Sequence, residues 1–78
     1  MDKTIQEEIK AHLMRTNESF RNLMNRHHEY DVLVERLESK PALTAEEEIE
    51  EHRLKKLNLQ IKDQMEQIMS EYRLQHVN

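Results

Sequence analysis

The chain turns once, near its midpoint, in the stretch Ser39-Lys40-Pro41-Ala42-Leu43-Thr44-Ala45-Glu46-Glu47. Pro41 is the only proline among 78 residues, and a proline disfavours helical geometry at the residue before it. Thr44, with Glu47 three residues later, matches the capping box that begins many helices. The stretch therefore predicts that one helix ends near Ser39, that a loop spans about residues 40–43, and that a second helix begins near Ala45.

The sequence on either side of this turn contains no glycine, although glycine makes up about 7% of an ordinary chain. Glycine supplies the positive φ angles that tight turns and phosphate-binding loops need. Its absence predicts two long helices, over about residues 4–39 and 45–76, within one domain of residues 1–78. Thr4 and Glu7 repeat the capping box at the start of the first helix.

The first helix carries one candidate break, at Thr16-Asn17-Glu18-Ser19. These side chains can hydrogen bond to nearby backbone groups and so compete with the helix. Asn17 can cap a new helix, whose dipole Glu18 would complement. The sequence leaves open whether the first helix is continuous through Thr16-Asn17 or splits there.

Side chains suited to a helix–helix seam recur at helical spacing on both predicted helices. They are Phe20, Leu23, His27, Tyr30, Val34 and Leu37 on the first helix, and Leu54, Leu57, Ile61, Met65, Ile68 and Tyr72 on the second. Folding the chain about Pro41-Ala42 is expected to pair Val34 with Ile49 and Leu23 with Ile61. The predicted fold is therefore all-α, an antiparallel, coiled-coil-like two-helix hairpin.

A single seam buries too little apolar area to offset the ordering of so short a chain. Further apolar residues lie off the seam: Met14, Met24, Leu33, Leu59, Met69, Leu74 and Val77. We expect the hairpin to form a homo-oligomer, most simply a dimeric four-helix bundle. The candidate oligomer contacts are Met14, Met24, Leu33 and Met69.

Charged side chains form two groups on the second helix. The first is an acidic cluster at the start of the helix, which suits the helix dipole and could also hold a basic partner: Glu46, Glu47, Glu48, Glu50 and Glu51. The second is basic, with no acid between residues 52 and 62: Arg53, Lys55, Lys56 and Lys62. The candidate interaction surface comprises Glu46, Glu47, Glu50, Lys55, Lys56, Leu59 and Lys62. An alternative is that the Arg53–Lys62 stripe contacts phosphates, but the net charge of −4 and the lack of interleaved aromatic residues disfavour nucleic-acid binding.

No combination of residues predicts catalysis. His27 and Asp31 lie one helical turn apart, but two ligands do not make a metal site, and His27 is expected to be a polar seam residue held by Asp31 or Tyr30. The chain has no cysteine, no phosphate loop and no dinucleotide motif, so we expect no enzyme and no cofactor. It also has no apolar run near the ~20 residues that span a bilayer and no apolar leader after Met1, which predicts a cytoplasmic protein.

Two groups of residues resemble the YdcH-like family of short bacterial proteins, classed as a domain of unknown function. The first comprises Asn17, Phe20-Arg21-x-Leu23, His27 or His28, Tyr30-Asp31 and Val34-x-Arg36-x-Glu38. The second is Leu54-Lys55-Lys56-Leu57-x-Leu59-x-Ile61-Lys62-Asp63-x-Met65. The likeness covers about residues 10–72, although Glu18 stands where members often have proline and Tyr30 where they often have leucine. It implies a helical hairpin and brings no established activity.

The sequence thus predicts a small, non-enzymatic helical protein that works as a protein–protein interaction or assembly module, with a partner that the sequence does not identify. The alternative is a nucleic-acid-associated accessory protein that uses the Arg53–Lys62 stripe.

Overall fold

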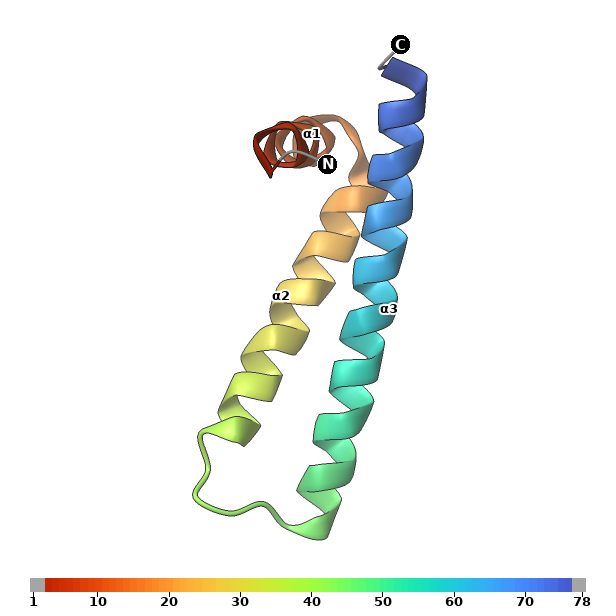
Figure 1. Ribbon diagram of the computed structural model, residues 1–78. Helices are drawn as coiled ribbons and strands as arrows, with labels where there is room; N and C mark the ends of the chain where they lie inside the picture. Colours follow the sequence, from red (N-terminus) through yellow and green to blue (C-terminus); the bar gives the residue numbers. More distant parts are fainter. Residues whose placement is uncertain (1–2, 77–78) are drawn as a thin grey trace.

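The computed structural model describes residues 3–76, which form three α-helices and no strand (Figure 1). These are α1 (Lys3–Thr16), α2 (Glu18–Glu38) and α3 (Ala45–His76). The all-α class is confirmed. The question left open by the sequence is answered by a split at Asn17, which gives three helices in residues 3–76. Val77, one of the off-seam apolar residues, lies outside the described residues.

The break between α1 and α2 is held by side chains on both of its sides. Asn17 is extended, with φ −123° and ψ 107°, and its side-chain oxygen accepts a hydrogen bond from the Phe20 N–H at 2.9 Å. On the other side, the Arg21 guanidinium donates to the Met14 carbonyl at 3.2 Å and to the Arg15 carbonyl at 3.3 Å. Because the ends of helices leave backbone groups unpaired, these two side chains stabilise the split chain.

The loop of residues 39–44 ends in the predicted capping box. The Glu47 N–H donates to Thr44 Oγ1 at 3.1 Å, and the Thr44 N–H donates to Glu47 Oε1 at 3.0 Å. The Lys40 ammonium also contacts the Glu47 carboxylate, which ties the loop to the first turn of α3. At the other predicted box, α1 is already helical from Lys3, so Thr4 lies inside the helix rather than before it.

α2 and α3 lie side by side and run in opposite directions (Figure 1). Their register differs from the expected one. Asn58 Nδ2 donates to Asp31 Oδ1 at 2.6 Å, whereas the expected pairing places Asp31 opposite residue 53, about five residues earlier on α3. The difference arises because the loop carries the start of α3 beyond the end of α2. Ile49, expected to pack on Val34, is therefore 69% exposed.

The main core lies at the end of the molecule remote from the loop, where α1 packs on both other helices. It comprises Ile9, Leu13, Phe20, Ile61, Met65 and Met69. The Tyr72 ring, on α3, adds a contact to the His12 ring of α1, with centroids 4.9 Å apart. Nearer the loop, Leu54 is the only buried apolar residue between Thr44 and Asn58. The α2–α3 pair is thus anchored at one end and thinly packed at the other.

Candidate functional site

One face of the α2–α3 pair carries two adjoining hollows that share His27 and Lys62. We call them together the lysine groove. The hollow nearer the loop has a volume of about 370 Å³ and includes three residues of the predicted interaction surface, Lys55, Leu59 and Lys62. The hollow nearer α1 has a volume of about 390 Å³ and adds Lys10 of α1 and the apolar side chain of Met24. The structure therefore brings part of the predicted surface together with α1.

His27 sits at the middle of the lysine groove, where its two hollows meet. Its Nδ1 lies 3.1 Å from Asp31 Oδ2, one turn along α2, which is one of the two contacts expected from the sequence. Asp31 in turn accepts the hydrogen bond from Asn58, so these three polar side chains link α2 to α3. Asn58 Oδ1 is buried without a hydrogen-bond partner in the described part of the chain.

The acidic residues of the predicted surface lie away from the groove, on the first turns of α3. Glu47 and Glu50 each serve the chain's own structure. The Lys40 ammonium, followed by the Thr44 N–H, holds the pKa of Glu47 below its ordinary value of 4.5. The Arg53 guanidinium lowers the pKa of Glu50 in the same way. Glu46 is exposed and has no ion pair among residues 3–76.

Some cations of the predicted stripe form ion pairs within the chain and others do not. Glu50 raises the pKa of Arg53, and Glu38 on α2, whose carboxylate lies 2.9 Å from Lys55 Nζ, raises the pKa of Lys55. Lys56 and Lys62 are exposed and form no ion pair within the described chain. Two of the four cations are therefore already engaged with the chain's own acids.

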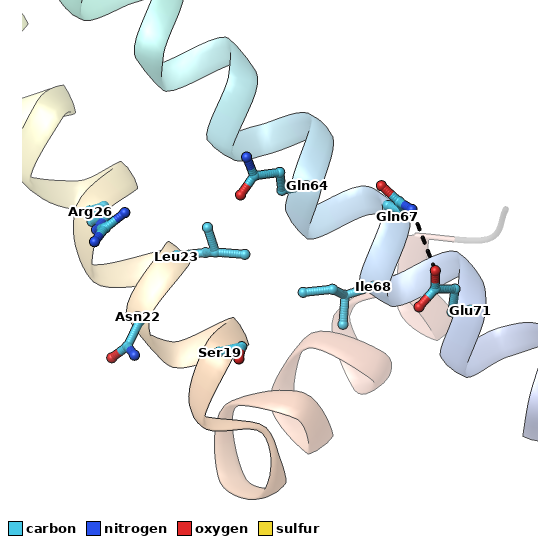
Figure 2. Close-up of a pocket in the computed structure, with 8 residues that line it drawn as sticks. All are labelled: Ser19, Asn22, Leu23, Arg26, Gln64, Gln67, Ile68 and Glu71. Carbon is cyan, nitrogen blue, oxygen red and sulfur yellow. Dashed lines mark hydrogen bonds between the residues drawn. The ribbon is translucent and has the colours of Figure 1, made fainter.

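The opposite face of the α2–α3 pair carries a third hollow, of about 430 Å³, to which α1 contributes no lining residue (Figure 2). Leu23 of α2 and Ile68 of α3 point toward each other across it (Figure 2). Its other lining residues are polar: Ser19, Asn22, Arg26, Gln64, Gln67 and Glu71. We call this hollow the amide groove. The sequence interpretation missed it, although its signal was present as polar residues at three- and four-residue spacing along both helices.

The four candidate oligomer contacts fall into different environments. Met69 is 2% exposed in the core of the single chain, so its expected place on an outer surface is wrong. It is buried because α1 packs on that side of α3. The expected two-helix hairpin leaves the same side of α3 uncovered. Met14 and Met24 are half-buried against the same core, and Leu33 is 40% exposed on α2.

Two further properties of residues 3–76 complete the description. No group of three or more histidine, aspartate or glutamate side chains in this range is placed to hold a metal ion. None of the described helices is both long and apolar enough to cross a membrane.

Together, the three helices and the two open grooves define a small all-α protein whose notable features are surfaces shaped by helix packing. A family model described as "Protein of unknown function (DUF465)" matches residues 20–69, which is most of α2, the loop and most of α3. The chain belongs to the DUF465 family, which includes YdcH, a helical protein of unknown function. No curated protein and no solved structure matches it.

Proposed function

We propose that this protein is a non-enzymatic assembly module that associates with itself and holds a partner protein. The observation that carries the proposal is that the chain exposes more surface than a compact monomer of its mass. The chain exposes 6094 Å², whereas a compact monomer of 9.5 kDa exposes about 5,000 Å². The excess of about 1,000 Å² is similar to the ~800 Å² that each partner buries in a standard interface.

The shape of the chain supports the same proposal. Its radius of gyration is 15.5 Å, compared with about 12 Å for a compact domain of this length. Among the described residues, only seven apolar side chains are buried, and Phe20 is the only large one that is less than 2% exposed. An elongated pair of helices with so small a core gains stability by packing on a second copy, which is the basis for the dimeric four-helix bundle.

The lysine groove is the proposed surface for the partner protein. Leu59 is 59% exposed and lies near Lys62, which forms no ion pair within the described chain, so an apolar contact adjoins an unpaired cation. This chemistry suits a helix that presents an apolar side chain beside carboxylates. The engagement of Arg53 and Lys55 by glutamates lessens the support for the alternative, in which the Arg53–Lys62 stripe binds nucleic acid.

A pull-down from native cell extract, at low and at moderate salt, tests the partner surface. We expect the tagged protein to capture a protein that the variant Leu59→Asp no longer captures. The matched control is Leu74→Asp, because Leu74 is 81% exposed and belongs to neither groove. Failure to capture any protein, or equal capture by both variants, would contradict the proposed surface.

Binding of fluorescent RNA and DNA oligonucleotides, measured at the same two salt concentrations, tests the alternative. Phosphate contacts weaken steeply as salt rises, whereas apolar docking does not. We expect no binding to either oligonucleotide at low salt. Salt-sensitive binding that is lost in Lys56→Glu and Lys62→Glu would instead favour the nucleic-acid function.

A further inference from the structure

We infer that the amide groove is the surface through which two copies of this chain pair, related by a two-fold axis that crosses the helices at the level of Leu23. This inference rests on the proposed self-association and specifies where it takes place. It is carried by the position of α1, by the charges of the groove and by the area of the face.

α1 covers part of one face of the α2–α3 pair and contributes no residue to the groove on the other face. Residues of α1 line one of the two hollows of the lysine groove, where Gln6 and Lys10 lie near Met69. The amide groove contains no residue of α1, and its apolar floor, Leu23 and Ile68, packs against the core from the uncovered side. The exposed Leu33 follows Arg26 by seven residues, so it extends the same face of α2 by two turns.

The charges of the amide groove suit a second copy of the same groove. The lining residues carry one cation, Arg26, and one anion, Glu71, so the groove is neutral although the chain has a net charge of −4. Two such faces can therefore approach without net repulsion at the contact. The amides of Asn22, Gln64 and Gln67 both donate and accept hydrogen bonds, so they can pair with the same residues of another copy.

The positions of the two charges define the symmetry. Taking Asp31 and Asn58 as one level, Arg26 lies five residues toward α1 and Glu71 thirteen residues toward α1, so they differ by about 12 Å along the helices. They also lie on different helices, on either side of Leu23 and Ile68. A two-fold axis that lies between the two faces and crosses the helices midway between these levels brings each Arg26 to the level of Glu71 in the other copy. The two residues are then separated across the groove by about one helix spacing, about 8–10 Å, a distance that the long arginine and glutamate side chains can bridge. The contact is then self-complementary, as an isologous interface requires.

The face is large enough for such a contact. The molecule measures 51 × 21 × 18 Å, so a rectangle of about 1,000 Å² bounds its broad side. A stable interface needs about 800 Å² from each partner. The broad side of the molecule is therefore of the size that such an interface needs.

Charge reversal with rescue tests this pairing. We expect Arg26→Glu and Glu71→Arg each to weaken dimerisation at least about tenfold in sedimentation equilibrium, since each substitution acts twice in a symmetric dimer and replaces attraction with repulsion. The double variant restores both ion pairs with reversed sign, and its dissociation constant is expected to return toward that of the wild type. Circular dichroism verifies that each variant remains helical.

Matched reversals on the opposite face provide the control. Lys62→Glu and Glu66→Arg change the charge by the same amounts in the lysine groove and are expected to leave dimerisation unchanged. The inference is overturned if the wild type is monomeric, if the single variants at Arg26 and Glu71 dimerise like the wild type, if the double variant is not rescued, or if the control variants weaken the dimer equally. A monomer that still captures a partner protein would overturn this inference and leave the interaction function standing.

Discussion

Replacing Phe20 with alanine is expected to remove a large part of the stability of the fold. The Phe20 side chain is 0% exposed and lies in the core that joins all three helices. Truncating a buried phenylalanine to alanine costs about 3–5 kcal/mol, which includes the cavity that remains. At about 0.05–0.15 kcal/mol per residue, a chain of this length has a free energy of unfolding of about 4–12 kcal/mol. Phe20→Ala therefore removes between a quarter and all of it.

Urea unfolding followed by circular dichroism measures this loss, with all samples at one protein concentration because self-association adds to apparent stability. The matched control is Leu74→Ala, which shortens an apolar side chain that is 81% exposed and is expected to change the free energy of unfolding by no more than about 0.5 kcal/mol. If Phe20→Ala cost less than about 1 kcal/mol, or no more than Leu74→Ala, the arrangement of α1 over the α2–α3 pair would be wrong.

Three further predictions concern polar contacts. Asn17→Ala should lower the free energy of unfolding by about 1 kcal/mol, because it removes the cap of α2, and Asn17→Asp should retain most of it; equal losses in urea unfolding would argue against capping. The pKa of Glu47 is lowered in the folded state, so its stabilising effect is present above pH 4.5 and declines as the pH falls below that value. The free energy of unfolding of Glu47→Gln, measured near neutral pH and at about pH 3, should therefore fall less on acidification than that of the wild type. An equal fall would show that the Lys40 contact does not cause the acid sensitivity. His27→Leu should keep or raise the melting temperature, since its contact with Asp31 is partly exposed to solvent and such ion pairs contribute little. If added metal raised the melting temperature of the wild type but not of this variant, His27 would instead be a metal ligand.

The local signals in the sequence predicted the local structure well. The capping box of Thr44 and Glu47 forms as expected, because both partners lie within one turn and need no distant contact. The break at Asn17 was left open, since the same residues can continue a helix or cap a new one. The split chain is stabilised by Arg21, which donates to the Met14 and Arg15 carbonyls near the end of α1. That contact depends on the chain having already turned.

The relative placement of the helices could not be obtained from the sequence. A loop of six residues can advance α3 by several residues or not at all, and the apolar spacing tolerates both, so the predicted register was wrong by about five residues. Met69 was expected on the outside because nothing in the spacing indicates that α1 folds across α3. For the same reason, the sequence did not distinguish the covered face from the uncovered one, and the amide groove was missed.

Sedimentation equilibrium of the unmodified protein over a wide range of concentrations tests the proposed self-association most directly. We expect a species of twice the 9.5 kDa chain mass that dissociates on dilution. A single species of 9.5 kDa up to millimolar concentration would contradict it.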